Sequence, residues 1–137
     1  MQNGKCLCGE TRFSVENVEL KHHVCHCGMC RTWGGGGPLF ASPANGVTWE
    51  EEKFLKRYDS SKWAERGFCG NCGTSLFYRS KPTDQYMFSV GVFENSADFE
   101  VIGEIFIDRK PNGYALAGDH PRETEAEVLA KFAPPNQ

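Results

Sequence analysis

Blocks of basic residues are missing from this sequence of 137 residues. Its 15 Lys and Arg residues are scattered among 18 Asp and Glu residues, and the formal net charge is −3. Proteins that bind nucleic acid through bulk electrostatics concentrate positive charge on one face or in one segment. The sequence therefore predicts no nucleic-acid partner.

Long apolar runs are missing as well. No stretch approaches the roughly 18 apolar residues that a bilayer-spanning helix needs, so we expect no membrane association. The chain begins Met1-Gln2-Asn3-Gly4-Lys5 and reaches a cysteine without the apolar segment of a secretory signal. We expect a cytoplasmic protein, in which thiols stay reduced and serve metal binding or catalysis in preference to disulfides.

Short strands separated by turn residues dominate the predicted secondary structure. Residues 11–15 alternate polar and apolar side chains, and residues 86–90 and 104–107 form the strongest further strands. Additional strands are predicted at residues 21–25, 38–41, 47–49, 54–58 and 75–78. This spacing favours a mainly β fold of antiparallel sheets over alternating βαβ units. The length of the chain predicts a single domain over residues 1–137.

One helix is predicted near the C-terminus. Thr124 and Glu127 match a capping box, in which each side chain bonds an otherwise unpaired amide. Pro134 and Pro135 end the helix. The apolar face consists of Val128, Leu129 and Phe132. We assign this helix to packing and not to chemistry.

Seven cysteines are the most informative feature of the sequence. They form three groups: Cys6 and Cys8; Cys25, Cys27 and Cys30; Cys69 and Cys72. Four thiolates complete a tetrahedral zinc shell, so seven cysteines cannot complete two such shells. If two zinc sites exist, one of them lacks a protein ligand, and chemistry could occur at that position.

The pair Cys69 and Cys72 has the spacing of a zinc knuckle, in which a tight turn brings two thiolates to one ion. Gly73 suits the positive φ that such turns often need. A knuckle supplies half a shell, and the isolated pair Cys6 and Cys8 is the natural source of the other half. Together they would form a closed structural site.

The group Cys25, Cys27 and Cys30 could bind one face of a zinc ion and leave the fourth position open to water, a substrate thiol or a distant side chain. The alternative is a second closed site. His26 lies between two ligands in sequence, which makes binding to the same ion difficult. Other histidines remain candidates for the fourth ligand: His22, His23 and His120.

Two further features adjoin this group. Cys27 and Cys30 form a CxxC motif, and such thiols can exchange disulfides, but no thioredoxin-like βαβ pattern precedes them. The run of glycines at residues 34–37 lacks the strand, the GK[ST] motif and the helix of a phosphate-binding loop. It is either a flexible connection or a backbone that approaches a ligand closely.

The cysteine-containing segments resemble the signatures of the glutathione-dependent formaldehyde-activating enzyme family, which belongs to the centromere protein V superfamily. The similar segments are residues 4–9, 25–31 and 67–73, followed by residues 106–111. Many relatives have a Trp after the last segment, where this chain has Asn112-Gly113-Tyr114. This difference would change one wall of the site.

The resemblance implies a β-tent fold of small antiparallel sheets clamped by zinc. It assigns Cys6, Cys8, Cys69 and Cys72 to a structural zinc, and it assigns Cys25, Cys27 and Cys30 to a catalytic zinc. The family's activity is a carbon–sulfur lyase reaction that links glutathione and formaldehyde as S-hydroxymethylglutathione.

An open thiolate-bound zinc fits this activity, because a coordinated substrate thiol loses its proton. Three thiolates donate so much charge that zinc would be a weak Lewis acid, which favours thiol binding over polarisation of the aldehyde. Arg31 follows the group and could bind a carboxylate of glutathione, or it could be a supporting arginine. Thr32 and Trp33 could line the entrance, although packing is the favoured role of Trp33.

Two other functions remain open. A zinc-stapled binding module without catalytic activity would have both zinc sites closed. A thiol-based redox or zinc-buffering protein would use the same cysteines without a substrate. The sequence does not indicate the oligomeric state.

Overall fold

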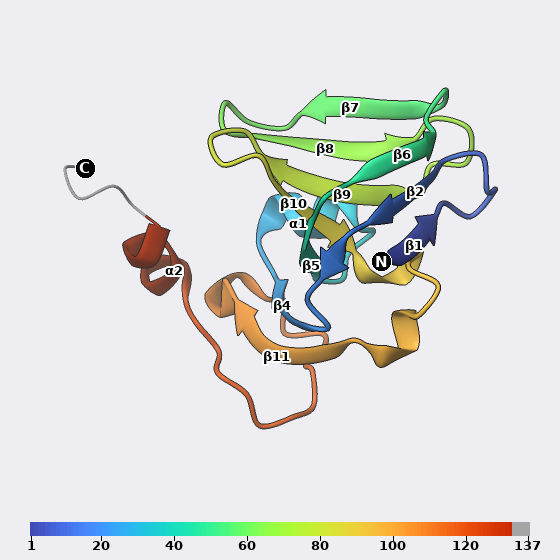
Figure 1. Ribbon diagram of the computed structural model, residues 1–137. Coiled ribbons are helices and arrows are strands. Elements are labelled where there is room, and N and C mark those ends of the chain that lie inside the picture. Colours follow the sequence, from blue (N-terminus) through green and yellow to red (C-terminus); the bar gives the residue numbers. More distant parts are fainter. Residues whose placement is uncertain (133–137) are drawn as a thin grey trace. The chain divides into compact units, whose positions relative to one another are not determined.

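The computed structural model describes residues 1–132 and is mainly β (Figure 1). The strands are β1 (Gln2–Lys5), β2 (Arg12–Val15), β3 (Asn17–Val18), β4 (Lys21–Cys25), β5 (Leu39–Asn45), β6 (Thr48–Glu51), β7 (Leu55–Asp59), β8 (Ala64–Cys69), β9 (Ser75–Ser80), β10 (Gln85–Ser89) and β11 (Glu100–Ile105). The helices are α1 (Gly28–Trp33) and α2 (Glu125–Phe132), with short 3-10 turns η1 (Val90–Val92), η2 (Ser96–Asp98) and η3 (Ile107–Arg109).

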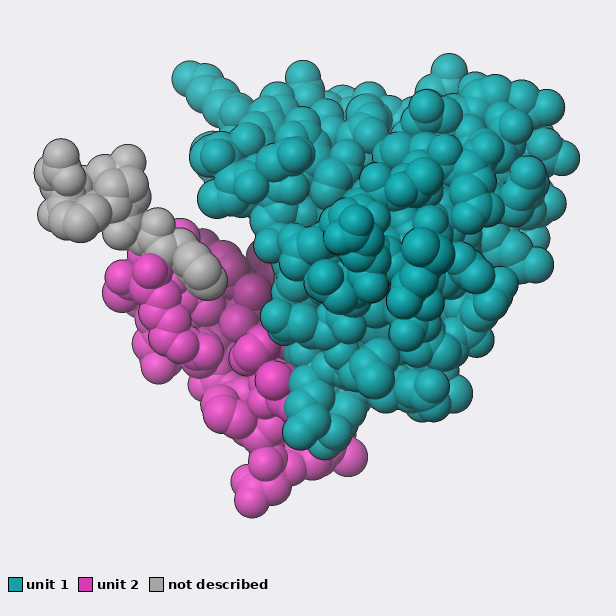
Figure 2. Space-filling model, viewed as in Figure 1, with its two compact units in different colours: residues 1–22, 41–100 teal, residues 23–40, 101–137 magenta. Residues whose placement is uncertain are grey.

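The chain divides into two compact units (Figure 2). Unit 1 contains residues 1–22 and 41–100, and unit 2 contains residues 23–40 together with the chain from residue 101 onward. The single domain over residues 1–137 stays a prediction.

Unit 1 carries two sets of antiparallel strands, as Figure 1 shows. Strands β1, β2 and β6 form one sheet in that order, and β5, β10, β9, β8 and β7 are neighbours in that order in the other. Phe13 on β2, Phe77 on β9 and Phe88 on β10 are fully buried. The rings of Phe13 and Phe88 stack with centroids 4.3 Å apart. Burial of such aromatic side chains supplies much of the hydrophobic stabilisation of a small β unit.

Two cysteines contribute to this same core, since Cys6 and Cys69 are buried against the aromatic cluster. Gly67 on β8 approaches Phe77 so closely that a Cβ atom there would lie 2.1 Å from the ring. The strand that ends in Cys69 is therefore pressed directly onto the core.

Unit 2 contains β4 from His23 onward, α1, the start of β5, most of β11 and α2. The end of β4 pairs antiparallel with the start of β5, with Val24 opposite Phe40 and Cys25 opposite Leu39. This pairing fixes the strand whose last residue is Cys25.

The predicted strands are confirmed, most of them with shifts of one or two residues at their ends, whereas β5 continues four residues beyond its predicted end and β11 begins four residues before its predicted start. One end differs for a clear reason: β11 stops at Ile105 because Phe106 adopts a left-handed conformation with φ of 56°. The predicted strand over residues 104–107 therefore runs two residues too far at its end, and it also misses the first four residues of β11. The sequence does not predict strands β1, β3 and β8 or helix α1.

The predicted capping box of α2 is confirmed. The Thr124 amide donates to Glu127 Oε1 at 3.1 Å, and the Glu127 amide donates to Thr124 Oγ1 at 3.3 Å. Val128 is buried as expected, whereas Leu129 is 55% exposed. The Phe132 side chain and the predicted stop at Pro134 and Pro135 lie outside the described residues. Within residues 1–132, no helix has the length and apolar character that a membrane span requires.

Candidate metal centres

Four cysteines gather in unit 1. The sulfurs all lie within 4.8 Å of one another and belong to Cys6, Cys8, Cys69 and Cys72. Cys6 follows β1, and Cys69 ends β8. Their carbonyls accept from the Gly9 amide at 3.2 Å and from the Gly73 amide at 2.7 Å, which closes a tight turn around each pair. The structure thus brings together the two pairs that sequence spacing had combined.

Hydrogen-bond donors surround the sulfurs of this cluster. The Thr11 amide donates to Cys6 Sγ at 3.3 Å, and Asn71 Nδ2 donates to Cys8 Sγ at 3.3 Å. A hydrogen bond from the Thr74 hydroxyl, with backbone amides, lowers the pKa of Cys72 to about 5. Donors of this kind stabilise the thiolate, which is the form that binds metal. The four cysteines therefore form a donor set suited to a closed tetrahedral zinc site.

Three cysteines gather in unit 2. The sulfurs of Cys25, Cys27 and Cys30 all lie within 4.8 Å of one another. Cys25 ends β4, whereas Cys27 caps α1 by accepting from the Cys30 amide at 3.4 Å. The short helix α1 thus turns the chain so that Cys30 faces the two preceding sulfurs.

The neighbouring thiols of Cys27 and Cys30, and then burial, raise the pKa of Cys25 far above its ordinary value. Three crowded thiols resist ionisation in the absence of a positive charge, and a bound divalent cation supplies that charge. This donor set fits a metal, and both cysteine clusters could hold one.

No further His, Cys, Asp or Glu of residues 1–132 places its ligand atom within 4.8 Å of all three sulfurs. His26 Nε2 lies 2.7 Å from Glu104 Oε1, and His26 Nδ1 lies 3.0 Å from the Tyr114 hydroxyl. His120 Nε2 lies 2.7 Å from Glu104 Oε2.

The other two candidate ligands, His22 and His23, also do not join the three sulfurs. The His22 ring packs against Phe99 with centroids 6.2 Å apart. The His23 ring lies against Gly103, where an added Cβ atom would be 2.4 Å from it.

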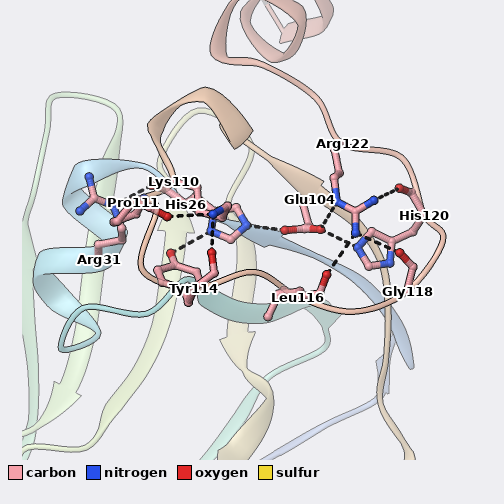
Figure 3. Close-up of polar contacts among 10 residues, drawn as sticks. All are labelled: His26, Arg31, Glu104, Lys110, Pro111, Tyr114, Leu116, Gly118, His120 and Arg122. Carbon is pink, nitrogen blue, oxygen red and sulfur yellow. Dashed lines mark hydrogen bonds and ion pairs between the residues drawn. The ribbon is translucent and has the colours of Figure 1, made fainter.

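Figure 3 shows the polar network that surrounds His26. Glu104 and Tyr114 come from segments 78 and 88 residues away in sequence, and both were missed by sequence analysis. The sequence marks residues 112–114 as a difference from many relatives, but it does not indicate that Tyr114 contacts His26. No local pattern reveals such contacts, because the pairing depends on the fold.

Arg31, on α1, donates from Nε to the His26 carbonyl at 3.0 Å. The guanidinium therefore supports the backbone between Cys25 and Cys27. Its far end points away from the His26 ring (Figure 3). The side chain is half-buried, so the arginine is both a supporting group and accessible to a ligand.

The glycine run ends helix α1. The Gly36 amide donates to the Arg31 carbonyl at 2.7 Å, and Gly35 has φ of 85°. Helices often end at such a left-handed residue, a conformation that glycine adopts without a steric cost. Thr32 is exposed and Trp33 is half-buried immediately before the run. The run has a structural role that neither of the two sequence interpretations included.

The chain is similar in sequence and in fold to known proteins. The sequence model of the glutathione-dependent formaldehyde-activating enzyme family matches residues 1–109. A Schizosaccharomyces pombe protein named as an uncharacterized lyase is 30% identical over 127 residues, which cover 92% of this chain and 93% of that protein. A crystal structure of a Rhodobacter sphaeroides protein has the same fold, with a TM-score of 0.54, 19% identity, and coverage of 88% of this chain and 98% of that one. The family model and the Schizosaccharomyces pombe relative show that the chain belongs to the glutathione-dependent formaldehyde-activating enzyme family.

Proposed function

We propose that this protein is a zinc-dependent carbon–sulfur lyase that forms or cleaves thiol–aldehyde adducts. Glutathione and formaldehyde are the proposed pair, with S-hydroxymethylglutathione as the adduct. Family membership and the lyase name of the Schizosaccharomyces pombe relative support this reaction class. The observation that carries the proposal is the cluster of Cys25, Cys27 and Cys30, which no fourth ligand atom from residues 1–132 completes.

The two cysteine clusters have different proposed roles. The cluster in unit 1 would hold a structural zinc, since four thiolates leave no position for a substrate. Cys25, Cys27 and Cys30 in unit 2 would hold a second zinc, which would lower the pKa of a substrate thiol. In the proposed addition the thiol sulfur would bond to the aldehyde carbon, the C=O double bond would become a single bond, and the thiol proton would pass through water to the oxygen.

Arg31 has a proposed role in binding the substrate. Its Nε–H is bonded to the His26 carbonyl, which sets the direction of the guanidinium. The Nη groups can then bind a carboxylate of glutathione, because guanidinium and carboxylate match in geometry and charge. A thiol without carboxylates would lose this contact and bind more weakly.

The proposed partners are therefore small molecules in the cytoplasm, with neither nucleic acid nor membrane involved. The alternative function, a zinc-stapled binding module, needs a fourth side chain at the second site. Residues 1–132 place no such ligand atom there, which favours the enzyme.

The test is the rate at which glutathione and formaldehyde interconvert with their adduct at equilibrium, measured by exchange NMR. Protein loaded with zinc at both sites should accelerate exchange over the protein-free solution. Cys30→Ser should remove the acceleration while the circular dichroism spectrum stays native. Equal exchange rates with and without the loaded protein would exclude glutathione and formaldehyde as the substrates.

A further inference from the structure

His26 lies in sequence between two cysteines of the three-sulfur cluster, and it is completely buried. Every polar group of this residue has a partner. Its amide donates to the Ile105 carbonyl at 3.1 Å, and its carbonyl accepts from Arg31 Nε at 3.0 Å. Its two ring nitrogens are engaged by the side chains of Glu104 and Tyr114.

Glu104 is the centre of the polar network in Figure 3. Its carboxylate is 99% buried and contacts His26 Nε2 at 2.7 Å, His120 Nε2 at 2.7 Å and Arg122 Nε at 2.8 Å. Arg122 also donates from Nη2 to the carbonyls of Leu116 and Gly118. Glu104 thus links His26 to the segment of chain that contains Tyr114.

The protonation of Glu104 determines how His26 bonds. Burial alone would raise the Glu104 pKa, but hydrogen bonds from His120 and His26 and the charge of Arg122 more than offset it and lower the pKa. An ionised carboxylate only accepts, so His26 donates from Nε2. The Tyr114 hydroxyl lies 3.0 Å from the other ring nitrogen, Nδ1, so side chains hold both sides of the ring.

Tyr114 is itself held in place. Lys110 donates from Nζ to the carbonyls of Tyr114 and Pro111, and the ammonium lies 5.1 Å from the centroid of the Tyr114 ring. Such a cation above an aromatic face adds a further attraction. The hydroxyl that reaches His26 is therefore presented by a fixed turn.

We propose that His26, clamped by Glu104 and Tyr114, is the positioning residue of the three-cysteine site. The two peptide groups of His26 lead directly to Cys25 and Cys27. Fixing its ring and backbone consequently fixes the directions from which both sulfurs approach a metal. The inference rests on the proposed function only in that a metal binds these cysteines, and metal binding can be measured without turnover.

The test compares Tyr114→Phe with Tyr58→Phe. Tyr58 lies on β7 in unit 1 and is 65% exposed, so its variant controls for the loss of a hydroxyl. Tyr114→Phe should release metal from the three-cysteine site about tenfold faster to a chelator, since removing groups that orient ligands commonly costs 10–100-fold in affinity. Release from the four-cysteine site should not change in either variant.

Two additional measurements separate positioning from general destabilisation. The absorption of Co(II) at the three-cysteine site should change in Tyr114→Phe and in Glu104→Gln, and should match the wild type in Tyr58→Phe. Nitrogen NMR should find the His26 proton on Nε2 in the wild type. Wild-type release and absorption in folded Tyr114→Phe, or an unprotonated Nε2 in the wild type, would overturn the inference.

The test of the proposed reaction is independent of the test of the positioning role of His26. If the loaded protein does not accelerate exchange but the metal-release difference is found, the positioning role stands and the proposed reaction fails. If the protein is active, Tyr114→Phe should lower kcat more than it changes KM. An active enzyme in which Tyr114→Phe changes neither kcat nor metal release would remove the positioning role alone.

Discussion

Gly9 and Gly73 occupy matching positions in the two cysteine turns of unit 1. Each follows the second cysteine of its pair, and their φ values are 79° and 81°. A left-handed residue at this point reverses the chain, so both thiols of a pair face the same side. Two segments more than sixty residues apart in the sequence thus use one local geometry to present two sulfurs each.

We expect Gly73→Ala to destabilise the zinc-loaded protein by about 1 kcal/mol, because a side chain in the left-handed region costs roughly 1–2 kcal/mol. Space is not the cause, since an added Cβ would meet nothing within 4 Å. Gly91→Ala is the matched control, because its Cβ is equally unobstructed and its φ is not positive. Denaturant unfolding measures the stability of both variants. Equal losses of stability would show that the left-handed conformation of Gly73 is not the cause.

Gly67→Ala should lower the free energy of unfolding more than Gly73→Ala does, and for a different reason. The new Cβ would lie 2.1 Å from the Phe77 ring, which is fully buried and cannot move aside without disturbing the core. Overpacking of this kind costs typically 1–3 kcal/mol. Adding Phe77→Leu should recover part of the loss if the clash is the cause. A double variant no more stable than the sum of the two single changes would argue against it.

The acid dependence of stability should reflect Glu65. Its carboxylate contacts Arg57 Nη1 at 2.6 Å and Arg79 Nε at 2.7 Å. Burial alone would raise the Glu65 pKa, but these two arginines lower it. Because the folded pKa lies below the unfolded value, the contribution is present above the unfolded pKa and disappears as the pH falls through the folded pKa.

Glu65→Gln should therefore lower the free energy of unfolding by about 2 kcal/mol near neutral pH, as for hydrogen bonds to charged groups. The difference between wild type and variant should shrink as the solution is acidified below the unfolded pKa. Glu50→Gln, at an exposed position, should show no such trend. Unfolding curves at several pH values measure the difference, and a constant difference would show that the ion pairs are not its source.

Local patterns in the sequence were enough to locate most strands, the capped helix α2 and the three cysteine groups. The sequence pattern does not predict strand β8, because this strand buries the charged residues Glu65 and Arg66, which a hydrophobic pattern does not reveal. Burial of Glu65 is tolerated because Arg57 and Arg79 come from the neighbouring strands β7 and β9. Such compensation exists only after the sheet has formed.

The sequence does not predict helix α1, because six residues are too few for a helical period to be visible. It does not predict the network around His26 for a related reason. Glu104 and Tyr114 reach it across most of the chain, and nothing in either local sequence indicates a partner. The cysteine spacing could suggest ligands, but not the groups that hold those ligands in place.

The helix cap at Thr124 should be measurable in isolation. Its hydroxyl and amide both bond Glu127 Oε1, at 2.9 and 3.1 Å. Thr124→Ala removes the side-chain cap and should cost about 1 kcal/mol. Thr124→Ser keeps the hydroxyl and should retain most of the stability that Thr124→Ala loses. Amide hydrogen exchange across α2 is the suitable measurement, and equal exchange in both variants would show that the cap is not needed.

The two cysteine clusters should respond differently to the same chemical change. Cys72→Ser and Cys30→Ser each replace one sulfur by oxygen, and each affects one cluster of closely spaced sulfurs. Cys69, beside Cys72 in the first cluster, is part of the aromatic core. Loss of metal there should therefore loosen unit 1, since structural zinc contributes roughly 10–16 kcal/mol in small zinc domains.

Cys72→Ser should lower the midpoint of thermal unfolding strongly and make it insensitive to added zinc. Cys30→Ser should keep a midpoint close to that of the wild type, because β4 and α1 retain their backbone hydrogen bonds without this sulfur. Elemental analysis of the purified variants should find one metal equivalent fewer in Cys30→Ser. Similar midpoints for the two variants would mean that the four-cysteine cluster does not stabilise the fold, and that the two clusters have no division of roles.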